Sequence, residues 1–311
     1  MGSLAQPKLP VIDFCEKNLK PGTNSGLSTR NETVRALEEY GCFVAVYDTV
    51  SLDLHNANFQ ASKQLFDLPT ETKKQNTSDT PNHGYKMQQL YKELRNSLIS
   101  SGPPEMILSG IICVFMQICV FFFFFFSFFE WSINLTLCYL CCFLVSETVL
   151  SFSKLASELD QTVKKMVSES YGIQKYHEYR LGSTCYLLKP TKYREPKMNE
   201  TNIGILPHTD SSFFTILHQY QAWTNGRIES PIHRVIMSSK ERYFLGLFSL
   251  VRDLLIEIPE EVVDDAHPLQ YKPFYHYKLL RFCKLGGGQE NEIQIVKETT
   301  EDSSSVRTSS L

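Results

Sequence analysis

Three residues in the second half of the chain have the types and the order of a metal site. His208 and Asp210 are separated by one residue, and His233 follows within the stretch 231–235, Pro-Ile-His-Arg-Val. Residues two apart on a β-strand project from the same face, so His208 and Asp210 can point together while His233 comes from a neighbouring strand. Two imidazoles and one carboxylate leave positions open on an iron ion for an organic co-substrate and dioxygen. The set contains no thiolate, which argues against a closed structural zinc site.

An arginine and a strand-like pattern follow these residues. Arg242 leads into the run Tyr243–Phe248, in which apolar residues predominate and alternate as they do in a strand. A guanidinium presented by such a strand offers two parallel donors to a carboxylate. We therefore expect Arg242 to bind a carboxylate near the three ligands.

Five further stretches carry a family pattern. They are Leu9–Phe14, Val34–Phe43, Gln64–Lys73, Ala222–Arg227 and Ser230–Val235. The first resembles the opening strand of the plant 2-oxoglutarate- and Fe(II)-dependent dioxygenases, which are isopenicillin N synthase-like, and the second resembles their first helix leading into the next strand. The last two are similar to that family's sequence around the distal histidine. The nearest likeness is to the subgroup of glucosinolate side-chain dioxygenases and gibberellin-oxidase-like enzymes.

The resemblance implies a fold, a set of cofactors and a reaction. The fold is α+β, with a double-stranded β-helix (jelly-roll) core behind an N-terminal region of helices and strands. His208, Asp210 and His233 would hold Fe(II), Arg242 would bind the distal carboxylate of the co-substrate 2-oxoglutarate, and Tyr186 would place a hydroxyl near it. Dioxygen is the other co-substrate. The expected reaction is hydroxylation, desaturation or side-chain cleavage of a small plant metabolite, and no catalytic residue is expected beyond the metal ligands.

Two departures from the family pattern concern the site and the barrel. Phe244 stands where the family has a serine, so one hydrogen bond to 2-oxoglutarate is lost. Only 22 residues, 211–232, separate Asp210 from His233, whereas the family places several more strands there. We therefore expect an incomplete barrel with unpaired strand edges. A catalytically inactive remnant of the family is the first alternative function.

A third departure is the apolar segment 106–145. Its first 24 residues, 106–129, carry no charge and include six consecutive phenylalanines at 121–126. Its composition is typical of a pyrimidine-rich intron read as coding sequence, which is the first interpretation. Its length also suits a membrane helix, and a buried core helix is the third interpretation. A membrane-anchored protein is therefore the second alternative function.

Composition and length lead to expectations about regions, partners and cellular location. The expected regions are an N-terminal dioxygenase region at 1–98, the hydrophobic insert at 99–146, the dioxygenase core at 147–283, truncated between Gln221 and Ala222, and a disordered tail at 284–311. A net charge of -3 gives no reason to expect nucleic acid, so the expected partner is a small-molecule substrate, and no specific protein partner is inferred. Neither a disulfide framework nor a secretory signal is apparent. We expect a cytoplasmic location, with membrane association as the alternative if the segment 106–145 is real.

Overall fold

The computed structural model describes residues 8–74, 84–88, 105–109, 132–177, 183–198, 200–210, 218–251 and 254–279. In these ranges the helices are α1 (Asn24–Tyr40), α2 (Leu52–Asp67), α3 (Thr70–Lys74), α5 (Ser132–Ser170) and α7 (His218–Trp223), with 3-10 turns η1 (Glu16–Asn18), η2 (Gln174–Tyr176) and η3 (Glu260–Val262). The strands are β1 (Val11–Asp13), β2 (Val44–Val46), β3 (Gly84–Gln88), β4 (Glu105–Ser109), β5 (Thr184–Tyr193), β6 (Ile203–His208), β7 (His233–Ile236), β8 (Arg242–Val251), β9 (Leu255–Ile256) and β10 (Phe274–Tyr275). The fold is thus a mixture of helices and strands.

Local capping explains where the N-terminal helices begin and end. The Thr23 hydroxyl accepts a hydrogen bond from the backbone N–H of Gly26 at the start of α1, and Ser51 accepts one from Leu54 at the start of α2. Helix α1 ends at Gly41, whose φ of 68° lies in the left-handed region that favours glycine. The chain can therefore turn directly from α1 into β2, which pairs in parallel with β1.

Helix α5 covers one face of the largest sheet. From residue 147 onward its apolar residues recur at helical spacing, and Val149, Val163 and Val167 are buried. Val163 and Val167 pack in the main core with residues of β1 and α1, whereas Val149 packs with Leu188 of β5 and Leu247 of β8. This part of α5 is therefore an amphipathic helix whose apolar face packs on the sheet and the main core.

The largest sheet has the strand order β3-β4-β5-β8, and its neighbouring strands are antiparallel. Strands β5 and β8 pair over their whole length, from Thr184 opposite Val251 to Tyr193 opposite Arg242. This register fixes which side chains of the two strands share a face. The alternating run after Arg242 is therefore a strand, as expected.

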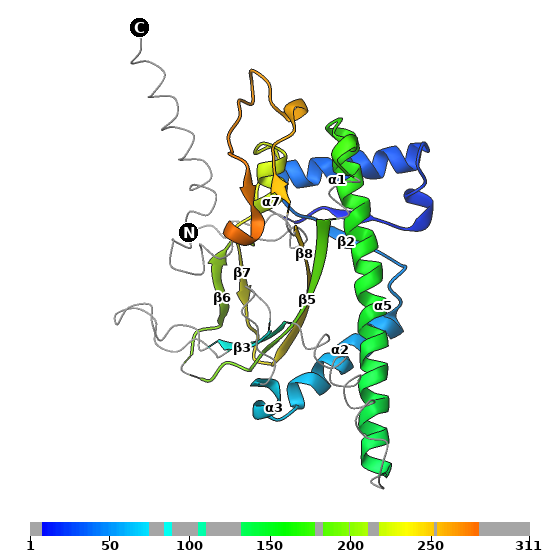
Figure 1. Cartoon of the computed structure of the whole chain (residues 1–311), viewed down its shortest axis with the longest axis vertical. Coiled ribbons are helices and arrows are strands. Elements are labelled where there is room, and N and C mark those ends of the chain that lie inside the picture. Colours follow the sequence, from blue (N-terminus) through cyan, green and yellow to red (C-terminus); the bar gives the residue numbers. More distant parts are fainter. Residues whose placement is uncertain are drawn as a thin grey trace, which may run out of the picture.

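Strands β6 and β7 form a separate antiparallel pair beside this sheet. In Figure 1, helices α2 and α5 lie on one side of β5 and β8, and β6 and β7 lie on the other side. The side chain of Tyr193 on β5 reaches Gly204 on β6, where a Cβ would lie 3.2 Å from the tyrosine ring. Among the described strands, β6 and β7 each have one neighbour only. The incomplete barrel stays a prediction, because residues 211–217 of the connection lie outside the described ranges.

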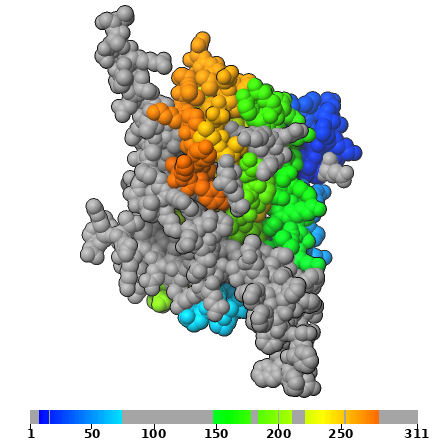
Figure 2. All heavy atoms as spheres, viewed as in Figure 1, coloured from blue at the N-terminus to red at the C-terminus, as the bar shows by residue number. Residues whose placement is uncertain are grey.

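The last described segment, residues 254–279, packs against one end of the main core. Ile256 and Val262 are fully buried and pack against residues of α5 and β1. The space-filling view shows this segment, in orange, against the green surface of α5 (Figure 2). The tail 284–311 lies outside the described residues.

The apolar segment 106–145 is described only in part. Its beginning belongs to β4, which pairs with β5, and its end forms the first turns of α5, while residues 110–131 lie outside the described ranges. No helix in the described part of the chain has the length and apolar character needed to cross a bilayer. The intron interpretation stays a prediction, because most of the residues that motivate it are outside these ranges.

Candidate metal centre

His208 and His233 face each other across the β6–β7 pair. His208 is the last residue of β6, His233 is the first residue of β7, and the two are direct partners in the register. The centroids of their rings are 4.3 Å apart. The expectation that the third residue comes from a neighbouring strand is confirmed.

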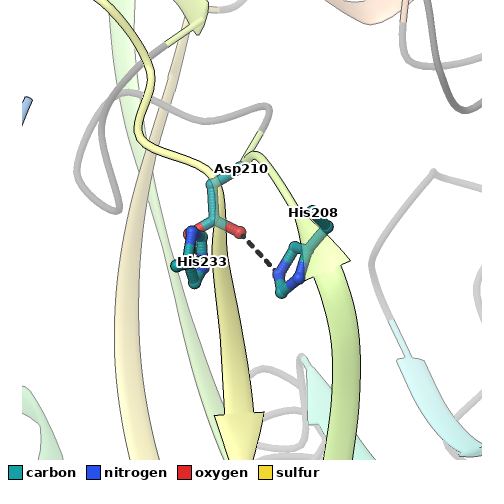
Figure 3. A group of neighbouring side chains, drawn as sticks. All are labelled: His208, Asp210 and His233. Carbon is teal, nitrogen blue, oxygen red and sulfur yellow. Dashed lines mark ion pairs between the residues drawn. The ribbon is translucent and has the colours of Figure 1, made fainter. Parts of the chain in front are cut away.

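Asp210 completes the group from outside the strand. It lies two residues beyond the end of β6, because β6 ends opposite the first residue of β7 and the backbone leaves the sheet there. The expectation that His208 and Asp210 sit together on one strand was therefore wrong, although both side chains reach the same point. Figure 3 shows the Asp210 carboxylate placed between the two imidazoles.

The distances leave space for an ion. Nε2 of His208 is 3.6 Å from Oδ1 of Asp210, and Nε2 of His233 is 3.6 Å from Oδ2. These separations exceed hydrogen-bond length. All three ligand atoms lie within 4.8 Å of one another. Two neutral imidazoles and one carboxylate on one side of a shared point are a donor set that fits Fe(II).

Backbone hydrogen bonds hold the two imidazoles in the orientation that a metal needs. Nδ1 of His208 lies 2.8 Å from the carbonyl oxygen of Leu206, and Nδ1 of His233 lies 3.2 Å from that of Pro231. A ring nitrogen that donates to a carbonyl carries the proton, so the lone pair of each neutral ring sits on Nε2. Both lone pairs therefore belong to the atoms that face Asp210.

The Asp210 carboxylate also affects the protonation of its neighbour. It is the largest reason that the pKa of His208 lies above its usual value, while partial burial of the ring opposes this shift. A proton and a metal ion compete for the same nitrogen. The same carboxylate that helps to bind a cation thus also favours the protonated imidazole.

A tightly bonded turn places the start of β7. Asn225, with φ 53°, donates from its amide to the carbonyl oxygens of His267 and Pro268 and accepts a hydrogen bond from the backbone N–H of Gln270. Further along, the backbone of Gly41 lies so close that a Cβ would be 2.4 Å from the carbonyl oxygen of Glu229. The segment leading to His233 is therefore held by both the C-terminal segment and α1.

Arg242 lies on the face of β8 that looks toward β6 and β7. Leu247 of β8 packs against the helices, so residues at even numbers, including Arg242 and Phe244, project from the opposite face. A Cβ at Gly246 would contact the rings of Phe244 and Phe248, which confirms that these side chains share that face. Within the described residues, no side-chain partner binds the Arg242 guanidinium. Arg242 is thus on the same side of the sheet as the three candidate ligands.

The structure does not bring Tyr186 to this site. Tyr186 pairs with Ser249 and projects toward α5, where its hydroxyl donates to Oδ2 of Asp160 at 2.7 Å. Asp160 also bonds Lys164, whose ammonium donates to the Ser249 hydroxyl at 3.2 Å. Burial and the Asp160 charge hold the pKa of the Tyr186 hydroxyl above its ordinary value. Tyr186 is therefore part of a buried polar network between helix and sheet, on the far face from Arg242.

The tyrosine that does lie on the site face is Tyr193. It pairs directly with Arg242, is 3 % exposed, and points toward β6. Sequence reasoning missed it because it chose the aromatic residue in 185–188 without the register of β5 against β8. The available signal was parity: Tyr186 and Tyr193 are seven residues apart on one strand, so they must lie on opposite faces.

Comparisons with known proteins identify relatives of the chain. Residues 9–98 match the family model described as the non-haem dioxygenase in morphine synthesis N-terminal region. The chain is 35% identical to the probable 2-oxoglutarate-dependent dioxygenase AOP1.2 of Arabidopsis thaliana, over 91% of this chain and 92% of that protein. It is 25% identical to the probable inactive 2-oxoglutarate-dependent dioxygenase AOP2 of the same plant, over 93% of this chain and 96% of that one.

A solved structure shows the same fold. The dioxygenase for auxin oxidation of rice superposes with a TM-score of 0.66 at 19% identity, covering 91% of this chain and 97% of the rice enzyme. At that identity the likeness concerns the fold alone. The residues around His208, Asp210 and His233 carry the functional argument.

Proposed function

Because the chain belongs to the 2-oxoglutarate-dependent dioxygenases, we propose that it oxidises a small molecule with Fe(II) held by His208, Asp210 and His233. The observation that carries this proposal is the pair of Nδ1 hydrogen bonds to Leu206 and Pro231, which leaves both Nε2 atoms facing the Asp210 carboxylate. Two histidines that only pack against each other on paired strands would not need the proton on Nδ1 in both rings.

The metal and its co-substrates would supply the difficult chemistry. Bound together, Fe(II), 2-oxoglutarate and dioxygen provide the oxidation of an unactivated C–H bond, with hydroxylation, desaturation or side-chain cleavage of a small plant metabolite as outcomes. The chain's own residues bind and orient the reactants.

Arg242 and Tyr193 would hold the co-substrate. The Arg242 guanidinium would donate two parallel hydrogen bonds to the distal carboxylate of 2-oxoglutarate, and the adjacent Tyr193 hydroxyl would donate a third. Support comes from their direct pairing on the face that looks toward the candidate ligands. Tyr186 has no part in this proposal, because its hydroxyl bonds Asp160 on the other face.

The sheets would be two facing halves of a jelly roll. The β3-β4-β5-β8 sheet would form one half and the β6–β7 pair the remainder of the other, with the site between them. This arrangement is supported by the contact between Tyr193 and the β6 backbone at Gly204. The second half would be incomplete, since β6 and β7 have no further neighbours among the described strands.

An inactive protein with an intact metal site is the second candidate. Phe244 favours it, because its ring lies two residues from Arg242 on the site face, where the family has a serine hydroxyl. One relative is itself named as a probable inactive member. In this second candidate function, His208, Asp210 and His233 bind a metal, but 2-oxoglutarate is not bound in a productive orientation.

Co-substrate turnover separates the two candidates. The full chain, loaded with Fe(II) in air-saturated buffer, is incubated with 2-oxoglutarate alone, and succinate is measured. If the site turns over 2-oxoglutarate, we expect slow succinate formation that stops in Arg242→Met. Full metal occupancy with no succinate above that of Arg242→Met would favour the inactive protein.

A further inference from the structure

Arg227 joins the segment that leads to His233 to the last described segment of the chain. It lies directly after the turn 224–226, and its side chain is 16 % exposed. Nη1 donates a hydrogen bond of 2.6 Å to the carbonyl oxygen of Val262, and Nη2 donates one of 2.7 Å to Oδ2 of Asp264. Nη2 also lies 3.2 Å from Nδ1 of His267. One guanidinium thus contacts three residues of the loop 262–267.

The groups around the Arg227 guanidinium are themselves held in place. The backbone N–H of His267 donates to Oδ1 of Asp264 at 2.8 Å, so the carboxylate that receives Arg227 is also fixed through its other oxygen. The guanidinium carbon lies 5.8 Å from the centroid of the Tyr171 ring at the end of α5, and the Tyr171 hydroxyl donates to Oε1 of Glu38 in α1 at 2.7 Å. Figure 1 shows these elements gathered at one end of the molecule. Arg227 therefore contacts both the loop and the end of α5.

Short contacts connect Arg227 to the group that orients the His233 ring. The next residue, Ile228, is fully buried in the main core, and its backbone N–H donates to the Thr224 hydroxyl at 3.1 Å. Three residues further, Pro231 provides the carbonyl oxygen that lies 3.2 Å from Nδ1 of His233. A shift of the backbone at Arg227 is therefore passed to the carbonyl that orients the imidazole.

The two hydrogen bonds to the loop use the forked shape of an arginine. Val262 offers a carbonyl oxygen and Asp264 offers a carboxylate oxygen, and separate nitrogens of one planar guanidinium reach them. A lysine ammonium is a single nitrogen without this fork. A ligand that is held in its binding geometry before the metal arrives avoids the cost of being ordered on binding. Fixing the segment before β7 should therefore raise the affinity for a metal.

Resting on the proposed function, we propose that Arg227 is a positioning residue for the ligand His233, through which the loop 262–267 raises the affinity of the metal site. In this role Arg227 touches neither the metal nor 2-oxoglutarate. It fixes the segment that carries the Pro231 carbonyl, and this carbonyl fixes the ring. Coupling between two sites is reciprocal, so metal binding in turn strengthens the contact between Arg227 and the loop.

A double-mutant cycle tests this role by titrating the full chain with Co(II) alone and following the visible absorption. The variants are Arg227→Met, which keeps the apolar stem, Arg227→Lys, which keeps the charge, His233→Ala, and the double variant of Arg227→Met with His233→Ala. Arg30→Met is the matched control, because Arg30 is also partly buried and bonds Glu169 at 3.4 Å between α1 and α5. Circular dichroism confirms that each variant is folded in the titration buffer, and Arg227→Lys replaces Arg227→Met in the cycle if the latter is not.

Arg227→Met should bind Co(II) about tenfold more weakly than the wild type, since groups that orient metal ligands contribute about 10–100-fold to metal affinity. Arg227→Lys should fall between the two proteins. Arg30→Met should change the affinity less than about twofold, and so should Arg227→Met when His233 is already alanine, because the residue that Arg227 positions is then absent. An unchanged affinity in the Arg227 variant, or equal losses with and without His233, would overturn the proposal.

The outcome for the proposed function is read separately from the same titrations. If His233→Ala weakens Co(II) binding and the Arg227 variants do not, the metal site stands and the positioning role fails. If the wild type binds no Co(II), or binds it as tightly as His233→Ala does, the metal site itself fails and the positioning role fails with it.

Discussion

His208 and His233 are direct cross-strand partners at the point where β6 ends and β7 begins, with ring centroids 4.3 Å apart. Both rings donate from Nδ1 to the carbonyl oxygen two residues earlier in the chain, so the same local bond sets both orientations. The site thus depends on where the segment before each histidine is held. For His233, that segment is held by α1 and by the C-terminal loop.

The first prediction concerns the contact between α1 and the segment before His233. Gly41→Ala places a Cβ 2.4 Å from the carbonyl oxygen of Glu229 and requires alanine at φ 68°. Gly172→Ala is the matched control, since Gly172 has φ 70° but no atom within 4 Å of its Cβ. We expect Gly172→Ala to lower the free energy of unfolding by about 1–2 kcal/mol, the cost of alanine at positive φ. Gly41→Ala should lower it by about 1–3 kcal/mol more than Gly172→Ala does, because its Cβ also meets the backbone of Glu229.

Urea denaturation and metal titration check this prediction together. Gly41→Ala should also weaken metal binding, because Glu229 and Pro231 must move and His233 follows them. Equal losses of stability in the two variants would show that the close approach at Gly41 contributes nothing.

The second prediction concerns Phe244. Phe244→Ser restores a hydroxyl two residues from Arg242, and a hydrogen bond to 2-oxoglutarate contributes roughly 0.5–1.5 kcal/mol, equivalent to about a two- to tenfold gain in affinity. Phe244→Ala removes the ring without adding the hydroxyl and separates the two effects. Calorimetric titration of 2-oxoglutarate measures all three proteins. A serine variant no better than the alanine variant would mean that the hydroxyl does not reach the co-substrate.

The third prediction separates the two tyrosines of β5. Tyr186→Phe removes the donor to the buried Asp160 carboxylate and should lower the free energy of unfolding by about 1–3 kcal/mol without changing 2-oxoglutarate affinity. Tyr193→Phe should instead weaken 2-oxoglutarate binding. Each variant is measured by urea denaturation and by co-substrate titration. The reverse pattern would place Tyr186 at the site and refute the assignment of faces.

The fourth prediction is a pH dependence in the connection between β5 and β6. Arg194 donates two hydrogen bonds of 2.7 Å to Glu200 and is the largest reason that the pKa of this carboxyl falls to about 2. A lowered carboxyl pKa gives stability that is present above the unfolded value of 4.5 and is lost as the pH falls toward 2. The unfolding free energy of the wild type should therefore fall across this window more steeply than that of Glu200→Gln. Parallel acid limbs for the two proteins would contradict the lowered pKa.

Sequence alone predicted much of the site because its signals are local. The types and order of His208, Asp210 and His233 predicted that His233 comes from a neighbouring strand, and the alternation after Arg242 predicted β8. Family membership is confirmed by a relative 35% identical over most of the chain. What sequence could not supply was cross-strand register. Without it, Tyr186 was preferred to Tyr193, and Asp210 was expected on a strand that ends at His208.

The incomplete barrel was predicted from a length, the 22 residues between Asp210 and His233. Among the described strands, β6 and β7 pair only with each other, and the incompleteness of the barrel stays a prediction because residues 211–217 lie outside the described ranges. Sequence could not show whether the remaining pair would still assemble the three ligands. In the structure, strands β6 and β7 assemble the three residues by pairing His208 directly with His233. Asp210 lies two residues beyond the end of β6, and its carboxylate reaches both histidines.

The central claim, that this site binds Fe(II) and then 2-oxoglutarate, is tested most directly by an anaerobic titration of the full chain. Fe(II) is added first and 2-oxoglutarate second, and the visible spectrum is followed for the metal-to-ligand charge-transfer band of a chelated keto acid. We predict a band that saturates at one equivalent of iron in the wild type and is absent in His233→Ala, since that variant keeps only His208 and Asp210. A folded, iron-loaded wild type without the band, or a His233→Ala variant that retains it, would contradict the claim.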